Sequence, residues 1–368
     1  MGSRALYGTD PPRGPGSHAR PPRPAPVFPA GGIARFRPSA PRGYLLRPSG
    51  VPMPCDRCER PAVIDQPYCS GHLCDRHFRD SVEERVRREM HRQLPRFAGG
   101  TVAVAVSGGK DSAVALVLTQ RYFSRRPNVR LVAVSVDEGI DGYRSATLRS
   151  ARALTARLGI EHRIESMGER LGVTTDRTAR ALPGTAPCSF CGVWRRTLLN
   201  RAARDEGATV LVLGFNLDDL AQTVLMNLAR ADLGRLERMA PHRTRQEGLV
   251  PRIAPLAAIP EREVYLYARL RDLPFDHGEC PHAGAAVRNV FRDILWQLEE
   301  AMPGTRQALL RTRDAFLRGP RRPAGGAPSV PGRCTVCGEP SSGPRCRACA
   351  YRDGAGNPFN TPVPSGMP

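Results

Sequence analysis

The sequence has almost no lysine: of its 55 basic residues, all but Lys110 are arginine. Aromatic residues are also few, at 6% of the chain, and hydrophobic residues make up only 40%. No apolar run exceeds the length of a strand, so no membrane span is expected, because a spanning helix needs about 20 apolar residues. The N-terminal region has no hydrophobic segment of the kind that marks a secretory signal. We therefore expect a cytoplasmic protein whose cysteines are not assumed to form disulfides.

Proline, glycine and arginine are abundant instead. Much of the 36 Pro and 36 Gly lies in residues 1–52 and 318–332, which lack apolar periodicity and are expected to be an arm and a linker without a fixed fold. The formal charge is +20, and the first fifty residues, with eight Arg and one Asp, leave +13 for the rest. So basic a remainder indicates a polyanionic partner, most commonly nucleic acid. An Arg-rich composition without such a partner would give the same charge.

Strand and helix patterns alternate through the middle of the chain. The β-branched run at residues 102–106 is typical of a buried parallel strand and leads into a glycine-containing loop. Further strands are expected at residues 129–136, 160–164 and 209–214. Helices are expected at residues 78–94, 111–122, 144–158, from the central cysteines to 206, 216–229, 261–271 and 285–300. This alternation predicts a parallel, doubly wound α/β sheet.

The loop after the first of these strands has the composition of a phosphate-binding loop. It consists of Ser107, Gly108, Gly109, Lys110, Asp111 and Ser112. It is not a Walker A loop. Its glycines allow close backbone approach, the following helix N-terminus attracts an anion, and Lys110 adds a compact charge that arginine replaces poorly. We call this hexapeptide the phosphate loop, and the only lysine of the chain lies within it.

The hexapeptide is similar to the PP-loop of the N-type ATP pyrophosphatases. That resemblance implies cleavage of ATP between its α and β phosphates, with Mg²⁺, and adenylation of a substrate. It also implies that the end of the second strand, at Val136 and Asp137, contacts the nucleotide. A helix-capping role for Asp137 would account for that carboxylate equally well.

Eleven cysteines are present, and ten of them fall into three groups. Near the C-terminus, two short pairs form a four-cysteine pattern typical of a structural zinc ribbon. Its members are Cys334, Cys337, Cys346 and Cys349.

The N-terminal group begins with Cys55 and Cys58, a clear half of a zinc site. Two pairs fit as the other half: Cys69 with His72, and Cys74 with His77. We favour Cys74 and His77, because they stand at the entry to the expected helix, where zinc fingers commonly take their last ligands. Cys69 would then be a spare thiol.

The central group, Cys188, Cys191 and Cys280, lies within the α/β region. These thiols suit a redox pair, half of a zinc site or an iron–sulfur site, and His277 and His282 flank Cys280 without supplying an obvious fourth ligand. Three thiolates leave one position open, which suits a [4Fe-4S] cluster that binds an external ligand. The rivals are a persulfide or disulfide mechanism, and buried inert cysteines.

Together these features resemble the tRNA 2-thiouridine synthetases, PP-loop enzymes with a zinc module at each end. The resemblance covers about residues 55–350. Besides the phosphate loop and the two terminal cysteine groups, it rests on residues 187–192, 214–219, 221–227, 260–261 and 279–281.

The resemblance implies an adenine nucleotide alpha hydrolase-like fold and a two-stage reaction on tRNA. ATP adenylates the C2 oxygen of a uridine, and sulfur then displaces AMP to give 2-thiouridine. The sulfur would come from a ubiquitin-like carrier with a C-terminal thiocarboxylate or from inorganic sulfide, and the family is usually homodimeric. The resemblance also implies two Zn²⁺ ions, a cluster on the three central cysteines, and Asp219 as the catalytic carboxylate, with Asp218 as the adjacent possibility. Gly214 and Asp218 would belong to the nucleotide site.

Some positions depart from the family pattern. Phe215 replaces a usual histidine, Arg195 stands where lysine is common, and Ala254 stands where a lysine is usual. A 2-thiocytidine-forming PP-loop enzyme is the nearest alternative function, and the terminal zinc modules argue against it. A non-catalytic zinc-finger RNA-binding protein with a decayed nucleotide site is the other alternative, and the intact phosphate loop argues against that.

These patterns divide the chain into six expected parts. Family members usually start just before the first zinc cysteine, so residues 1–52 are expected to be either a basic arm or a misassigned start ahead of Met53. The parts are the arm (1–52), a zinc finger with its helix (53–95), the catalytic domain (96–317), a linker (318–332), a zinc ribbon (333–352) and a tail (353–368).

Overall fold

The computed structural model describes residues 53–239, 241, 246–318 and 332–356. The expected N-terminal arm, nearly all of the expected linker and most of the expected tail lie outside these residues. No helix within the described ranges is both long and apolar enough to cross a membrane.

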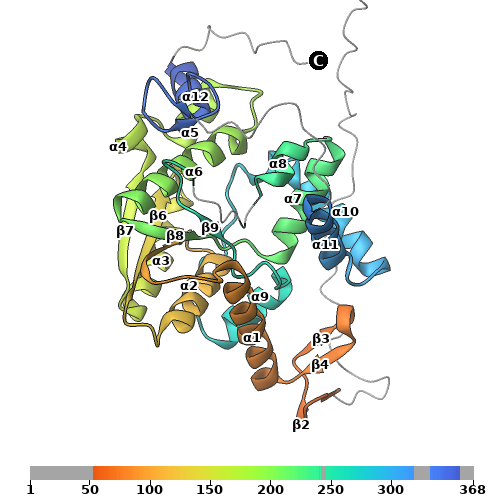
Figure 1. Ribbon diagram of the computed structural model, residues 1–368. Coiled ribbons are helices and arrows are strands. Elements are labelled where there is room, and N and C mark those ends of the chain that lie inside the picture. Colours follow the sequence, from red (N-terminus) through yellow and green to blue (C-terminus); the bar gives the residue numbers. More distant parts are fainter. Residues whose placement is uncertain (1–52, 240, 242–245, 319–331, 357–368) are drawn as a thin grey trace, which may run out of the picture. The chain divides into compact units, whose positions relative to one another are not determined.

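A parallel sheet lies at the centre of the catalytic region (Figure 1). Its order is β7-β6-β5-β8-β9, and every neighbouring pair is parallel. The strands are β5 (Gly100–Ala105), β6 (Val129–Asp137), β7 (Glu161–Ser166), β8 (Ala208–Val212) and β9 (Arg252–Ile253). The chain winds outward from β5 in both directions, as in doubly wound folds. The predicted fold class is confirmed.

Successive side chains of each strand point to opposite faces of the sheet, and each face is covered by helices. Val102 and Val104 of β5 pack into one apolar core, whereas Ala103 packs into another. The first core is closed by α1 (Asp75–Gln93), α2 (Lys110–Phe123), α3 (Arg144–Leu158) and α9 (Glu261–Leu270). The second is closed by α4 (Met167–Leu171), α5 (Thr175–Ala181) and α6 (Pro187–Asp205). Both faces of the strands are therefore apolar, which explains their β-branched composition.

A further helical layer packs on α7 (Leu217–Ala229). It includes α8 (Leu233–Glu237), α10 (Arg288–Ala301) and α11 (Thr305–Arg318). The helix expected at residues 285–300 starts at Arg288, after a 3-10 turn (Ala283–Ala285). The helix expected after the central cysteines starts before them, at Pro187, because proline at the first helical position has the backbone angle a helix needs.

Two small modules flank the sheet in the sequence. The first contains β1 (Pro54–Cys55), β2 (Cys58–Pro61), β3 (Ile64–Gln66), a 3-10 turn (Pro67–Cys69) and β4 (Gly71–Leu73), and it leads into α1. The second contains β10 (Gly332–Arg333), β11 (Pro340–Ser341) and α12 (Arg347–Gly356). Their strands are only two to four residues long and pair as hairpins, which are too small to form an apolar core of their own.

Candidate active site

The phosphate loop follows the end of β5, whose neighbours in the sheet are β6 and β8. From β5 the chain adds strands first on one side and then on the other, so the direction of winding diverges here. In doubly wound folds this divergence point is where ligands bind. Gly108 has φ +90°, and a Cβ added there would lie 1.9 Å from the carbonyl oxygen of Thr147 in α3. The backbone of the loop therefore packs directly on α3, and only glycine fits at this position.

Hydrogen bonds among its own residues hold the phosphate loop in shape. The hydroxyl of Ser112 donates to the carbonyl of Gly109 at 2.9 Å and accepts from the backbone N–H of Ser107 at 3.1 Å. The two serine hydroxyls are also 3.1 Å apart. These bonds leave the N-terminus of α2 facing the loop, with the backbone dipole favouring an anion.

Lys110 is held between two carboxylates. Its Nζ lies 3.0 Å from Oδ2 of Asp111 and 2.8 Å from Oε1 of Glu261 at the start of α9. Partial burial works against the charged form, but the negative charges of Asp111 and Glu261 prevail and raise the pKa of Lys110 above its ordinary value. The ammonium is thus fully charged and placed at the mouth of the loop. Glu261 was not singled out as a site residue from the sequence, although the preceding Pro260 marks a helix start.

The residues expected around the nucleotide adjoin the loop. A Cβ on Gly214 would lie 3.0 Å from the backbone nitrogen of Ser112, so this glycine permits the loop after β8 to approach the phosphate loop. Val136 is buried at the end of β6. Asp137 follows it and accepts a hydrogen bond from the N–H of Gly139 at 3.0 Å, a turn-capping contact.

The paired aspartates at the start of α7 have different surroundings. Asp218 is buried, with one oxygen accepting from the N–H of Glu261 at 2.7 Å and the other 2.6 Å from Nε of Arg306. Its carboxylate therefore joins three elements, α7, α9 and α11, and both of its oxygens are engaged.

Asp219 forms a capping box with Asn216 and lies 3.4 Å from Nη1 of Arg288. Crowding by surrounding protein desolvates its carboxylate, and the negative charge of Asp111 adds to this, raising the pKa of Asp219 to about 7. Asn216 also donates to Oδ1 of Asp111 at 2.9 Å, which ties the start of α7 to the phosphate loop. A carboxyl group with a pKa near neutrality, next to a phosphate site, is suited to proton transfer.

The three central cysteines come from α6 and from the loop before α10. Cys188 is exposed, Cys191 is buried and Cys280 is partly buried. Burial raises the pKa of both Cys191 and Cys280, and Cys188 interacts electrostatically with each of them. Sγ of Cys188 also lies 4.0 Å from the carbonyl oxygen of His282.

The three central sulfurs are not all within the spacing of a single-ion site. Among the described residues, the groups whose ligand atoms all lie within 4.8 Å of one another are the two terminal ones. One tetrahedral metal at about 2.3 Å from each sulfur would hold sulfurs about 3.8 Å apart.

A buried ion network, not foreseen from the sequence, lies between the phosphate loop and the central cysteines. Glu138 is 4% exposed and follows β6, and Arg144, also 4% exposed, begins α3. Arg195 lies one turn after Cys191 in α6. The Asp137-Glu138-Gly139 sequence resembles a polar turn, so nothing in it signals a buried carboxylate.

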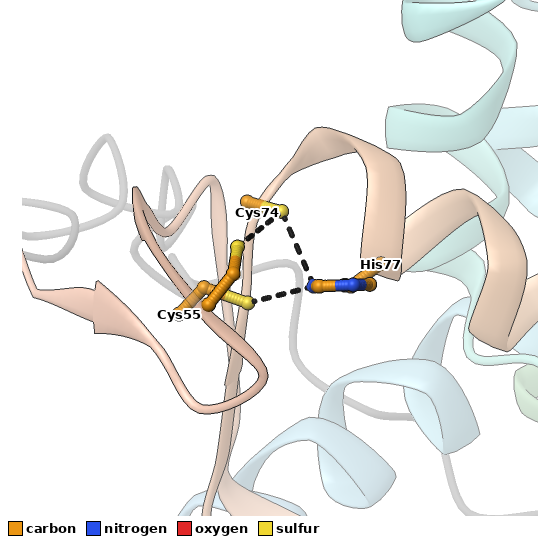
Figure 2. A group of neighbouring side chains, drawn as sticks. Cys55, Cys74 and His77 are labelled. Atoms are coloured by element: carbon orange, nitrogen blue, oxygen red, sulfur yellow. Dashed lines mark hydrogen bonds between the residues drawn. The ribbon is translucent and has the colours of Figure 1, made fainter.

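The N-terminal ligand group unites Cys55, Cys58, Cys74 and His77. Figure 2 shows how Cys55, Cys74 and His77 point toward one another. Nδ1 of His77 is 3.3 Å from Sγ of Cys55 and 3.6 Å from Sγ of Cys74. Burial opposes ionisation, but N–H groups of Cys74 and Arg57 donate to the sulfur and lower the pKa of Cys55 to about 6. A thiolate is the form that binds a metal. Cys69, the rival ligand, lies outside the group in the 3-10 turn.

The C-terminal ligand group unites Cys334, Cys337, Cys346 and Cys349. Backbone N–H groups, first that of Cys346, lower the pKa of Cys334 to about 6. This module rests on α6: Nε1 of the buried Trp194 donates to the carbonyl of Ala348 at 3.0 Å, and Arg204 pairs with Glu339 at 2.8 Å. Both four-ligand groups have the donor atoms of structural metal sites.

Comparisons with known families agree with this geometry. Residues 82–299 match the PP-loop domain, and residues 55–79 match the N-terminal LIM domain of the 2-thiouridine synthetase TtuA. The chain belongs to the tRNA 2-thiouridine synthetase family. The resemblance expected from the motifs is thereby confirmed.

Members of this family match over most of their length. The tRNA 2-thiolation protein NcsA of Haloferax volcanii is 39% identical, over 81% of this chain and 97% of its own. The cytoplasmic tRNA 2-thiolation protein 1 of Bos taurus is 38% identical, over 83% of this chain and 88% of its own. The solved structure of the U34-tRNA thiolase NcsA from Methanococcus maripaludis with its [4Fe-4S] cluster is 31% identical, covers 86% of this chain and all of its own, and has a TM-score of 0.71.

Proposed function

We propose that this protein is an ATP-dependent tRNA sulfurtransferase that converts a uridine to 2-thiouridine. The observation that carries the proposal is the convergence of the phosphate loop, Asp219 and the three central cysteines at one end of the sheet in a member of this family. A nucleotide site next to a thiol site is what adenylation followed by sulfur transfer requires.

In the first stage the uridine C2 oxygen attacks the α-phosphorus of ATP, and pyrophosphate leaves. The N-terminus of α2 and the ammonium of Lys110 stabilise the negative charge that develops on the phosphates. Glu261 releases Lys110 as ATP binds, because the phosphates compete for the same ammonium. At this stage the carboxylate of Asp219, with its pKa near 7, either transfers a proton or serves as a ligand of Mg²⁺.

In the second stage hydrosulfide attacks C2, AMP leaves with the original oxygen, and loss of a proton leaves the C2 thiocarbonyl. If a carrier thiocarboxylate attacks instead, the carrier stays attached through sulfur after AMP leaves, and water must then cleave its acyl–sulfur bond to give the thiocarbonyl and the carrier carboxylate. Cys188, Cys191 and Cys280 would hold a [4Fe-4S] cluster, as in the Methanococcus maripaludis relative. When bound, such a cluster supplies a place to hold sulfur for transfer. The two terminal ligand groups would each hold one Zn²⁺.

The substrate is tRNA, which agrees with a net charge of +20. The relatives named as tRNA 2-thiolation proteins support this substrate, and the Methanococcus maripaludis relative, a U34-tRNA thiolase, supports position 34.

We place the protein in the cytoplasm, as the name of the Bos taurus relative suggests, and infer a homodimer from the family. The sulfur donor is a ubiquitin-like thiocarboxylate carrier or inorganic sulfide.

The test is anaerobic turnover by the full-length protein reconstituted with iron and sulfide. It is incubated with unmodified tRNA, Mg-ATP and sulfide, and nucleosides are analysed by mass spectrometry alongside a pyrophosphate assay. We expect ATP-dependent 2-thiouridine at position 34, and no product from Cys280→Ser. Formation of 2-thiocytidine, or absence of any thionucleoside from a protein with a spectroscopically intact cluster, would overturn the proposal.

A further inference from the structure

Glu138 contacts two arginines that belong to different parts of the site. Its Oε2 lies 2.7 Å from Nε of Arg144, an ion-pair contact without the alignment of a hydrogen bond. Its Oε1 lies 3.5 Å from Nη1 of Arg195. The side chains of Glu138 and Arg144 are each only 5% exposed, whereas that of Arg195 is half-exposed.

The first arginine reaches the phosphate loop. Nη1 of Arg144 donates to the carbonyl oxygen of Ser107 at 2.6 Å and to the hydroxyl of Thr147 at 3.0 Å. The carbonyl of Thr147 is the group against which Gly108 packs. Arg144 therefore sets the position of the loop's first two residues relative to α3.

The second arginine adjoins the central cysteines. Arg195 follows Cys191 by four residues in α6, so the two side chains share one helix face. Its positive charge acts on the buried thiol of Cys191, opposing the effect of burial on that thiol. Through its ion pair with Arg195, Glu138 holds this positive charge near Cys191.

We propose that Glu138 is a positioning residue that aligns the ATP loop, through Arg144, with the thiol site, through Arg195. The proposal rests on the proposed function, since it takes the loop to bind ATP and the cysteines to hold the cluster. Without its carboxylate, a buried arginine loses its counter-charge, and such a loss displaces the side chain or the backbone around it. The Ser107 contact is then lost, and Arg195 is free to move away from Cys191.

The test is the affinity for ATP of the cluster-free, full-length protein, measured by titration calorimetry without tRNA. Glu138→Gln keeps the shape of the side chain and removes its charge, and we expect the Kd for ATP to rise about tenfold. After reconstitution, we expect the electron paramagnetic resonance spectrum of the reduced cluster to shift in Glu138→Gln and in Arg195→Gln. Arg195→Gln should leave the Kd for ATP within about twofold of the unaltered protein, because the contact between Glu138 and Arg144 remains.

Glu165 supplies a matched control on the neighbouring strand. It is equally buried and also lies between two arginines, Arg163 and Arg170, each at 2.6 Å, but neither of these contacts the phosphate loop or Cys191 in the described structure. Glu165→Gln should leave both the Kd for ATP and the spectrum unchanged. If both glutamine variants change ATP affinity equally, or if Glu138→Gln changes neither readout, the proposal is wrong.

Two further outcomes are decisive. If Glu138→Gln does not fold, Arg144→Lys replaces it, since a lysine keeps the charge but cannot contact Glu138 and the Ser107 carbonyl at once; unchanged ATP affinity in that variant contradicts the proposal. If the unaltered protein itself binds no ATP or holds no cluster, the proposed function fails and not this assignment alone.

Discussion

At the scale of single residues, Lys110 shows how the site is prepared for its substrate. The negative charges of Asp111 and Glu261 compensate its ammonium, so Lys110 stays charged at the phosphate loop. Of these two partners, Glu261 lies on another helix, so we expect a bound phosphate to replace Glu261 at the ammonium while the loop stays folded.

Lys110→Arg is expected to abolish adenylation while leaving the fold and the bound metals intact. A planar guanidinium keeps the charge but does not fit the space in which one ammonium contacts two carboxylates. Loss of one stabilising group of this kind costs about a hundredfold or more in rate. Pyrophosphate release measures the effect, with circular dichroism and metal content as controls. Near-normal release would refute the role of the lysine.

Asp219 gives a pH-dependent signature at the same scale. Its pKa of about 7 in the folded chain lies above the ordinary aspartate value of about 3.9, so between these values the folded state binds the proton more readily than the unfolded state. The free energy of unfolding contributed by this group therefore falls as pH rises from about 4 to 7. Asp219→Asn should remove that slope in urea unfolding measured at pH 5 and pH 8. An unaltered slope would mean that Asp219 is not the group responsible.

At the scale of elements, the N-terminal module is fastened to the helix that carries Glu261. Two residues further along α9, the buried Glu263 accepts hydrogen bonds from Gln66 at 2.9 Å and Tyr68 at 2.6 Å and pairs with Arg85 of α1. The N-terminal module, α1 and α9 thus meet at the carboxylate of Glu263. This residue lies within one helical turn of Glu261, which pairs with Lys110.

Glu263→Gln should destabilise the protein far more than an ordinary surface change. It leaves the largely buried Arg85 without its counter-charge, and breaking a buried pair of this kind costs about 3 kcal/mol or more. Glu84→Gln is the control, because Glu84 pairs with Arg87 at the surface, where such pairs contribute about 1 kcal/mol or less. Urea unfolding compares the two. Equal losses would show that Glu263 does not fasten the finger.

The elements themselves were largely predictable, because long periodic segments carry their own signal. The helix expected at residues 144–158 has those bounds in the structure, as α3. The short helices α4, α5 and α8 were missed, since five to seven residues are too few to establish a helical period. The longer helices α11 and α12 were not predicted either. The choice of Cys74 and His77 over Cys69 and His72 depended on the helix start, and the structure places Cys74 at the N-cap of α1.

The contacts between elements were not predictable from this one sequence. Glu138, Arg144 and Glu263 look like ordinary charged residues, and only the packing of strands and helices buries them. Their pairing depends on residues up to 178 positions apart, for which neither spacing nor composition gives a signal.

At the scale of the whole described chain, each small module rests on a helix that carries site residues. The N-terminal module contacts α9, which bears Glu261, and the C-terminal module contacts α6, which bears Cys188 and Cys191. Metal binding in either module is therefore expected to stabilise the catalytic region as well as the module.

Tryptophan fluorescence can follow this dependence. Trp194 is fully buried under Ala348 of the C-terminal module, and the other tryptophan, Trp296, is half-exposed. In a Trp296→Phe background, Cys346→Ser should release α12 and shift the emission of Trp194 to the red, since the module cannot fold without its metal. Cys69→Ser, outside both ligand groups, is the control. An unshifted emission in a metal-depleted C-terminal module would contradict the dependence.

The single ε-amine of the chain also makes its substrate site chemically addressable. An amine-selective acylating reagent that spares guanidinium groups has one ε-amine to modify, the one held by Asp111 and Glu261 beside the phosphate loop. Because these carboxylates keep the amine protonated, the reaction is run at alkaline pH. ATP should shield it, so peptide mass spectrometry of the acylated loop would report nucleotide occupancy at a single atom. Isotopic labelling of lysine would likewise place one resonance in the spectrum, at the catalytic loop and nowhere else.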